Sequence, residues 1–406
     1  MTEVFIVFML LLFSLAVFFR NDYIFTVLYL FAGVYLVGNL WTRKAIEAVK
    51  FQRIFSNRAF LGEEVSVRLV VTNTSWLPVL WLRIRESLPV DLAVHRFFRH
   101  VISLGPKEER SFELSLTARK RGYYLVGPLS AASGDLLGLF GEQQREGDTD
   151  YLIVYPKVIP LTRLQIPSRS PLGTLRHKQP IFEDPSRLLN KRDYIPGDSL
   201  RRIDWKATAG VGRLQVKQFE PSIALETAIF LNLDSADYEI KTRFDASELG
   251  IVIAASIANW IASRKQSVGL YTNGSDPIID GSVQTTAEKG KALRAKPIPP
   301  RKGRPHLMRI FDILARVQVG SHASFVDILR QEIVNLSWGT TLILITPVVR
   351  DELFDVLFQV RREGMSAVLI LAGPNPHFRE IEEKARTFKF PYYAVTFERD
   401  LDMWRY

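Results

Sequence analysis

The chain opens with two uncharged apolar stretches, which differ in pattern from everything that follows. Residues 4–19 contain one hydroxyl and no charge, and residues 23–41 are again uncharged after a polar break at residues 20–22. At a helical rise of about 1.5 Å per residue, each stretch is roughly 24 to 30 Å long, close to the thickness of about 30 Å for a bilayer core. The pattern predicts a transmembrane helical hairpin within residues 1–44.

Basic residues around the hairpin predict its orientation. Arg20 is the only basic residue between the two stretches. Five basic residues follow the second stretch: Arg43, Lys44, Lys50, Arg53 and Arg58. Because positive charge favours the cytoplasmic side, we expect a multi-pass protein of the cell (inner) membrane with its large domains in the cytoplasm. A cleaved signal peptide is the alternative, but the first stretch lacks a basic start and a small-residue cleavage site.

Residues 45–155 switch to an alternation of apolar and polar positions. Three runs show it clearly, at residues 64–73, 79–89 and 111–118, with Gly, Pro and Asn in the breaks between runs. A period of two is typical of strands that bury one face. We expect a small immunoglobulin-like β-sandwich that acts as a spacer or an interaction module.

Residues 222–406 alternate between apolar runs and longer amphipathic segments. The runs predict buried strands at residues 226–234, 267–273, 340–347 and 366–373. The other segments predict helices at residues 246–265, 306–318, 323–336 and 351–363. This order favours a doubly wound α/β domain with a mostly parallel sheet. Ligands of such sheets bind at the carboxyl ends of the strands, where the sequence places Asp234, Ser235, Asp237, Thr272, Thr346 and Pro347.

The connector, residues 156–221, contains the least generic stretch of the chain. DYIPGDSLRRIDWKATAGVGRLQVKQFE (193–220) combines many opposed charges with a tryptophan and a turn signal. A Pro-Gly turn precedes Asp198, which is placed to cap a helix over residues 199–208. Helical spacing predicts an inward apolar face that consists of Leu200, Ile203 and Ala207.

The polar residues of that helix are candidates for docking a partner. The candidate docking residues are Asp198, Arg201, Arg202, Asp204, Trp205 and Lys206. Arg202 and Lys206 lie four residues apart, where like charges are unfavourable unless an anion is near. Arg201 lies within reach of Asp204, and Trp205 is expected to be a packing anchor at the domain junction.

The charge balance of this stretch argues against nucleic acid. Residues 181–220 contain eight basic and six acidic side chains. A nucleic-acid groove needs basic side chains that are largely uncompensated and interleaved with exposed aromatic rings. Two roles therefore stay open: ion pairs that tie the stretch to a neighbouring domain, and a docking surface for a charged protein partner.

Composition narrows the chemistry further. The net charge of +10 favours anionic partners, and the basic run 288–306 predicts a loop that is either a solvated linker or makes contact with anionic lipid. The chain has no cysteine, which excludes disulfides and thiolate chemistry. The six histidines form no metal-binding pair, and His177 lies in a predicted loop. No phosphate-binding loop or nucleophile elbow is present, so we expect no catalytic residues, although a site built from distant residues stays open.

Several motifs together resemble a known family. KRGYYLVGP (120–128), GDLLGLFG (134–141), DYIPGDSLRRIDWKATA (193–209) and PPRKGRPHLMRIFDILARV (299–317) are similar to the family catalogued as domain of unknown function fifty-eight. The resemblance implies a bacterial or archaeal protein with a C-terminal domain similar to the von Willebrand factor A domain. It also implies a partner, a MoxR-type AAA+ ATPase. No enzymatic activity comes with the family name.

The von Willebrand resemblance raises the question of a magnesium site. Metal-binding members of that fold carry Asp-x-Ser-x-Ser after the first strand, but here Ala236 and Tyr238 stand where the two serines would be. We therefore expect no cofactor, or at most weak Mg²⁺ binding by Asp234, Ser235 and Asp237. The expected function is a membrane-anchored, non-enzymatic adaptor that works with the ATPase in protein assembly or maturation. A metal-dependent enzyme or ligand sensor that uses the strand-end crevice is the alternative.

Overall fold

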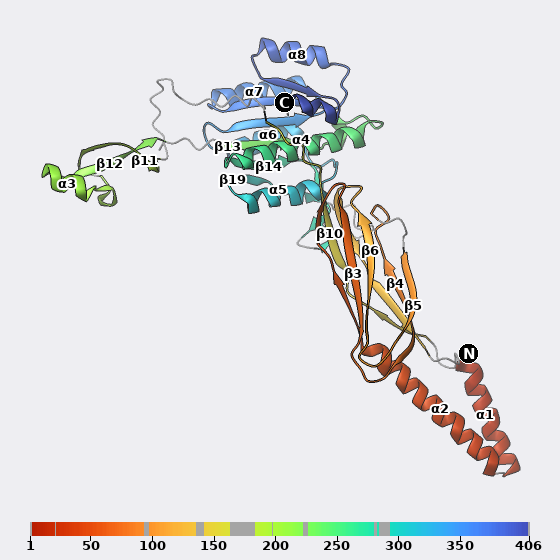
Figure 1. Ribbon diagram of the computed structural model, residues 1–406. Helices are drawn as coiled ribbons and strands as arrows, with labels where there is room; N and C mark the ends of the chain where they lie inside the picture. Colours follow the sequence, from red (N-terminus) through yellow and green to blue (C-terminus); the bar gives the residue numbers. More distant parts are fainter. Residues whose placement is uncertain are drawn as a thin grey trace. The chain divides into compact units, whose positions relative to one another are not determined.

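The computed structural model describes residues 2–20, 22–92, 97–134, 142–162, 183–196, 198–221, 226–279, 282–283 and 293–404. The chain forms two compact units, Met1–Pro156 and Lys157–Tyr406 (Figure 1). Some predicted features lie outside the described residues: the loop around His177, the turn residue Gly197, the side chain of Arg201, most of residues 134–141 and the start of the basic run 288–306.

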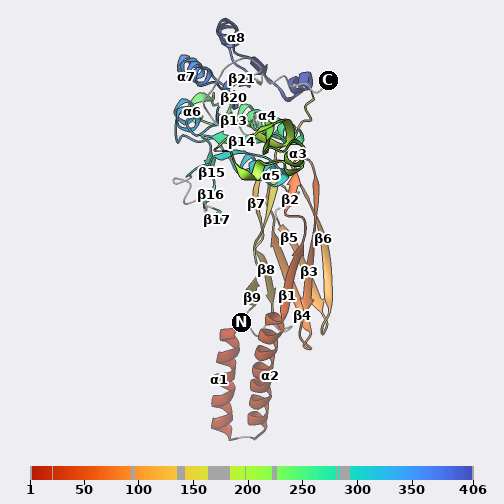
Figure 2. The same cartoon turned by 90° about the vertical axis from the view of Figure 1, so that its left-hand side faces the viewer.

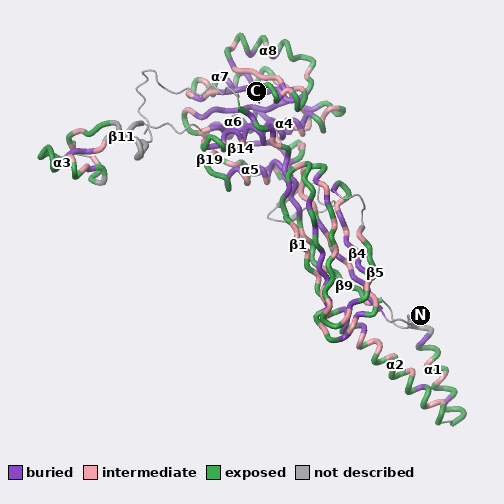
Figure 3. The backbone as a smooth tube through the Cα atoms, viewed as in Figure 1, coloured by how far each residue is buried: buried purple, intermediate pink, exposed green. Residues whose placement is uncertain are grey.

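Two apolar helices, α1 (Thr2–Phe19) and α2 (Asp22–Glu47), begin the first unit. They pack against each other, and the rings of Phe5 and Tyr35 stack with centroids 5.3 Å apart. By length and composition α2 can cross a membrane, and only 6% of its apolar window is buried. The apolar stretch of α1, Phe5–Phe19, is shorter. Most of both helices is exposed, as Figure 3 shows.

The second apolar helix is longer than predicted. α2 continues to Glu47, past the predicted end at residue 41 and the predicted boundary at residue 44. Charged residues such as Lys44 are good helix formers, so the change from apolar to polar sequence does not end the helix. Its last turn is also held by packing, because Ala45 and Ile46 are buried against the strands that follow.

The rest of the first unit is rich in β-structure, as predicted. Its strands are β1 (Val49–Ile54), β2 (Arg58–Phe60), β3 (Glu64–Asn73), β4 (Val79–Ser87), β5 (Phe97–Leu104), β6 (Glu109–Thr117), β7 (Gly122–Val126), β8 (Leu129–Ser133), β9 (Gln143–Glu146) and β10 (Asp150–Tyr155). They form three sheets with the orders β1-β3-β6, β5-β4-β8-β9 and β2-β10-β7. Alternate residues of β3 and β4, such as Leu69 and Leu82, meet in a shared core, which is the physical reason for the period of two in the sequence.

The second unit contains a six-stranded mixed sheet of order β19-β14-β13-β20-β21-β22. Its strands are β13 (Glu226–Leu231), β14 (Ser267–Thr272), β19 (Ile298–Arg301), β20 (Thr341–Thr346), β21 (Ser366–Ala372) and β22 (Tyr392–Val395). β19 is antiparallel to β14, and the other strands pair in parallel. Predicted strands at four positions are therefore confirmed, while the edge strands β19 and β22 were not predicted.

Helices cover both faces of this sheet. They are α4 (Arg243–Ser263), α5 (Arg304–Arg316), α6 (Phe325–Ile333), α7 (Asp351–Arg362) and α8 (Phe378–Thr387), with the 3-10 helices η2 (Ser235–Asp237) and η4 (Glu398–Trp404). α6, α7 and α8 share one core with the sheet, and Figure 2 shows α4 and α5 on the other side. α4 is apolar and long enough to cross a membrane, but 78% of its apolar window is buried, so it serves as the central core helix.

The remaining strands of the second unit are short or form a hairpin. Two small pairs follow β14: β15 (Ser275–Asp276) with β18 (Leu293–Arg294), and β16 (Ile278–Ile279) with β17 (Ser282–Val283). The antiparallel pair β11 (Glu183–Asp193) and β12 (Gln215–Pro221) encloses the 3-10 turn η1 (Leu200–Arg202) and helix α3 (Trp205–Val211). We call residues 183–221 the arm.

Candidate functional site

The arm folds differently from the single helix predicted over residues 199–208. Ile203 has an extended backbone and bridges Val216, and both side chains are buried. This pairing separates η1 from α3. The predicted cap is wrong as well, because Asp204, and not Asp198, caps α3 by accepting a hydrogen bond from the backbone N–H of Ala207 at 3.2 Å. Gly212, with φ of +72°, ends the helix in the left-handed conformation that glycine tolerates best.

Two acidic residues of the arm, Asp198 and Asp204, attach the intervening turns to strand β11. Asp198 accepts two hydrogen bonds of 2.7 Å from the guanidinium of Arg192 on β11. A third comes from the backbone N–H of Ile195 at 3.0 Å. The hydrogen bonds from Arg192, followed by the bond from Ile195, lower the pKa of Asp198 below its usual value.

Asp204 has a similar environment. The Nζ atom of Lys191 lies 2.8 Å from Asp204 Oδ2. This bond and the N–H of Ala207 lower the pKa of Asp204. The predicted neighbour Arg201 has no described side chain, so the ion pair that the structure shows is with Lys191. Both aspartates therefore have an internal structural role in the arm.

Large apolar side chains of the arm are exposed. Trp205 is 68% exposed. Four aliphatic side chains are 41% to 66% exposed: Ile195, Leu200, Val211 and Leu214. Neither Trp205 nor Leu200 packs inside the arm, so the predicted inward position of Leu200 is wrong. The reason is the small size of the element: α3 has no buried residue, and a hairpin with one short helix has little interior to offer.

Two basic side chains, Arg202 and Lys206, are exposed among these apolar groups. Arg202 also helps to stabilise the negative charge of Asp198, although less than Arg192 does. We call Leu200, Arg202, Trp205, Lys206 and Val211 the arm surface. Exposed apolar groups next to cations are typical of a protein-binding surface.

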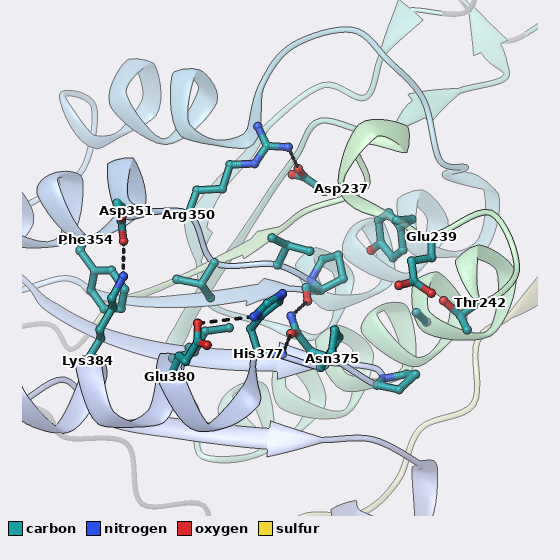
Figure 4. Close-up of a pocket in the computed structure, with 18 residues that line it drawn as sticks. Asp237, Glu239, Thr242, Arg350, Asp351, Phe354, Asn375, His377, Glu380 and Lys384 are labelled. Atoms are coloured by element: carbon teal, nitrogen blue, oxygen red, sulfur yellow. Dashed lines mark hydrogen bonds and ion pairs between the residues drawn. The ribbon is translucent and has the colours of Figure 1, made fainter.

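A second candidate site lies at the carboxyl ends of β13, β20 and β21. A cavity of about 450 Å³ opens there between the loop after β13 and the first turns of α7 and α8 (Figure 4). Strand β13 pairs with β14, the next long strand along the chain, on one side and with β20 on the other. Such a reversal of strand order leaves a crevice at the strand ends. Asp237 and Pro347, two of the predicted strand-end residues, line this strand-end crevice.

Charges of both signs line the strand-end crevice, and several are paired. Arg350 contacts Asp237 at 2.5 Å, and Lys384 contacts Asp351 at 2.6 Å. His377 Nδ1 lies 3.4 Å from a carboxylate oxygen of Glu380. Figure 4 shows all three pairs along the lining. Only 11% of the Asp237 side chain is exposed. Its negative charge is compensated by the ion pair with Arg350.

The predicted magnesium ligands do not form a metal site in the described part of the chain. No group of three His, Asp or Glu residues there is placed to hold a metal ion. Asp234 accepts a hydrogen bond from the N–H of Ala236 at 3.0 Å and caps η2. Ser235 donates its backbone N–H to Gly320, and Asp237 contacts Arg350.

A buried asparagine that was not among the predicted site residues organises these loops. Asn232, which is 1% exposed, donates to Asp237 at 2.8 Å and to Thr346 at 3.0 Å. Its side-chain oxygen accepts from the N–H of Asp234 and from Asn273, both at 3.0 Å. An asparagine inside the apolar run IFLNL is a signal that could have identified it, because a buried amide needs partners. Thr272, another predicted strand-end residue, accepts from the N–H of Gly274.

A curated relative of this chain carries no assigned activity in its name. This chain is 24% identical over 229 residues to "Uncharacterized protein YeaD" of Bacillus subtilis (strain 168). The aligned region covers 54% of this chain and 55% of that protein. The match thus spans about half the length of the curated relative.

Solved structures share only limited similarity with this chain. A CARDB domain from Pyrococcus furiosus in complex with di-metal ions matches 26% of this chain and 91% of that one, at 16% identity and a TM-score of 0.19. Native alpha-2-macroglobulin from Escherichia coli matches 34% of this chain and 22% of that one, at 16% identity and a TM-score of 0.22. These low scores carry no argument about function.

Residues 190–332, from the arm to α6, match the model of the family described as "Protein of unknown function DUF58", so the resemblance to this family is confirmed over that segment.

Proposed function

We propose that this protein is a membrane-anchored, non-enzymatic adaptor of a bacterial or archaeal cell membrane. In this proposal α1 and α2 anchor it as a multi-pass protein, and the rest of the chain is cytoplasmic. The arm surface binds a MoxR-type AAA+ ATPase in protein assembly or maturation. The β-rich region acts as an immunoglobulin-like spacer, and the α/β domain is von Willebrand factor A-like.

The observation that supports this proposal best is the exposure of Trp205 on a short stretch of the arm where Arg202 and Lys206 are exposed as well. Burying large apolar groups is favourable, so a 68% exposed tryptophan loses stabilisation that a partner could supply. Tryptophan and arginine are also the residues that contribute most at protein interfaces. The ion pairs of Asp198 and Asp204 hold the arm in shape before any partner binds, which lowers the entropic cost of association.

The matching experiment measures binding of the full chain, in lipid nanodiscs, to the purified ATPase. Trp205→Ala should weaken binding by about tenfold to thirtyfold, which corresponds to about 1.5 to 2 kcal/mol for an interface tryptophan. Reversing both Arg202 and Lys206 to Glu should also weaken binding. Thermal melts should change only slightly, because exposed charges change stability by less than about 0.5 kcal/mol and Arg192 holds Asp198 more strongly than Arg202 does.

Val334→Ala is the matched control for this experiment. Val334 follows α6 in the same unit and is 80% exposed, so its removal should affect neither folding nor binding. If Trp205→Ala and the double reversal both bind the ATPase as tightly as Val334→Ala does, the arm surface is not the docking site.

The strand-end crevice supports a second candidate function, a ligand sensor or a metal-dependent enzyme. The favouring observation is a cavity of about 450 Å³ with charges of both signs on its walls, since pockets of roughly 300 to 1,000 Å³ are typical of small-molecule sites. The adaptor ranks first because both cations in the crevice, Arg350 and Lys384, are already paired with carboxylates.

A further inference from the structure

Hydrogen bonds and packing join α2 to the β-rich region. The guanidinium of Arg145 on β9 donates to the carbonyl oxygens of Glu47 and Val49 at 2.5 and 2.8 Å. Helix ends leave their last carbonyls without partners, so Arg145 caps α2 and fastens it to the sheet. Ala45 is buried in the core that the strands form. The direction of α2 is therefore fixed relative to the strands.

The base of the β-rich region lies level with the end of the uncharged run of α2. The indole Nε1 of Trp41, the last residue of that run, donates to the carbonyl oxygen of Pro78 at 3.1 Å. Pro78 ends the turn between β3 and β4. Thr74 begins this turn and bonds to the carbonyl of Ala48 through its N–H at 3.0 Å and its hydroxyl at 2.7 Å. The turn is thus attached to the chain that leaves the helix.

This turn holds a tryptophan outward. Asn73, which is fully buried, donates to the carbonyls of Leu77 at 2.8 Å and Gly105 at 2.9 Å. Leu77 points into the protein and is 8% exposed, whereas Trp76 is 74% exposed. The exposure of Trp76 is consequently built into a well-bonded turn.

Exposed residues at the same end of the β-rich region as Trp76 match the chemistry of a membrane interface. Leu80, at the start of β4, is 44% exposed. Lys107, in the turn after β5, is exposed and donates its N–H to Ser75 at 3.0 Å, and Lys50 on β1 is exposed as well. Tryptophan is enriched at membrane–water interfaces because its ring is apolar with one polar edge. Lysines near a membrane surface are attracted to anionic lipid headgroups.

We propose that the turn of residues 74–78 is a membrane-interface anchor, in which the indole of Trp76 inserts among lipid headgroups. The inference rests on the proposed role of α2 as a membrane helix. Together with the capped end of α2, this second attachment point sets the tilt of the β-rich region relative to the bilayer.

The test uses the absence of cysteine from the chain. Single cysteines replace Trp76, Leu80, Val34 and Leu125 in separate full-length variants, and each receives an environment-sensitive fluorophore. The proteins are reconstituted in vesicles of phosphatidylcholine and phosphatidylglycerol that carry nitroxide labels at either the headgroup or the end of the acyl chain. The loss of fluorescence reports which depth each probe occupies.

Val34 and Leu125 are the controls. Val34 lies in the middle of α2 and is 46% exposed, so deep nitroxides should quench its probe most. Leu125 is 47% exposed on β7, and β7 ends next to Ser87 at the far end of β4. That end is about 30 Å from the base at roughly 3.4 Å per residue, so neither lipid should quench its probe.

The probes at positions 76 and 80 should be quenched more strongly by headgroup nitroxides than by deep ones. If the probe at position 34 is quenched while those at 76 and 80 behave like the one at 125, the interface anchor is refuted and the membrane helix stands. If the probe at 34 is not quenched either, the membrane role of α2 is wrong, and the interface anchor is refuted with it. A position-76 probe that is shielded from water without lipid quenching is covered by protein, which also refutes the lipid anchor.

Discussion

Removing Arg53 should strongly destabilise the β-rich region, because it would leave a buried carboxylate without its counter-ion. Only 5% of the Arg53 side chain and 1% of the Glu86 side chain are exposed. Arg53 Nε donates to Glu86 Oε1 at 3.0 Å, and its Nη1 atom contacts Asp150 at 2.9 Å. Breaking one partner of a buried ion pair costs about 3 to 5 kcal/mol, so we expect a loss of that size for Arg53→Met.

The same contacts predict how this loss changes with pH. Burial, which outweighs the charge of Arg53, raises the pKa of Glu86 above its ordinary value of 4.5. A raised carboxyl pKa means that the folded state binds the proton more tightly than the unfolded state does. The stability that this protonation contributes is therefore fully present below the unfolded pKa and is lost as pH rises through the folded pKa. Without Arg53 the pKa should rise further. The defect of Arg53→Met should therefore shrink as pH falls toward 4.5 and grow toward neutral pH.

Hydrogen exchange of the β4 amides in the full chain measures this free energy of opening. Arg68→Met is the matched control, because the pair Arg68–Glu113 on β3 and β6 is 57% and 67% exposed, and exposed pairs contribute about 0 to 1 kcal/mol. The double variant Arg53→Met with Glu86→Leu should recover most of the loss, since it removes both charges. Equal losses for the Arg53 and Arg68 variants, or no recovery in the double variant, would refute the reasoning.

Two further predictions concern the α/β domain and the arm. In titration calorimetry, Mg²⁺ or Mn²⁺ should bind the full chain weakly or not at all, because Asp237 is paired with Arg350. A low-micromolar dissociation constant that is lost in Asp234→Ala would instead support the metal-dependent alternative. The lowered pKa of Asp198 means that its ion pair stabilises the arm at pH values above its ordinary pKa of 3.8 and is lost as pH falls through the folded value. Amide exchange in the arm, corrected for intrinsic rates, should therefore increase in acid, and Asp198→Asn should show faster exchange at neutral pH with less further change; an unchanged acid response in this variant would assign the effect to other groups.

Much of the secondary structure could be predicted from local pattern. The run IFLNLD predicts β13 because a strand buried on both faces is apolar throughout, and the alternation in EVSVRLVV predicts β3 because one of its faces is buried. Helices α4 to α7 were predicted within a few residues of their observed ends. α8 was not predicted, because FREIEEKART has only Ile381 and Ala385 buried and its pattern is weak without knowledge of the sheet edge it covers.

The candidate sites depended on contacts between residues far apart in the sequence. Helical spacing alone favoured one continuous helix in the arm, but Ile203 gains a strand partner in Val216 once β11 and β12 pair. That pairing, and not local propensity, moved the cap to Asp204 and left Trp205 in solvent. In the strand-end crevice, Asp237 and Arg350 are separated by 113 residues. Composition and periodicity determined which segments are apolar, helical or extended, while tertiary structure decided which charges meet, because side chains at the ends of different strands become neighbours only when the sheet forms.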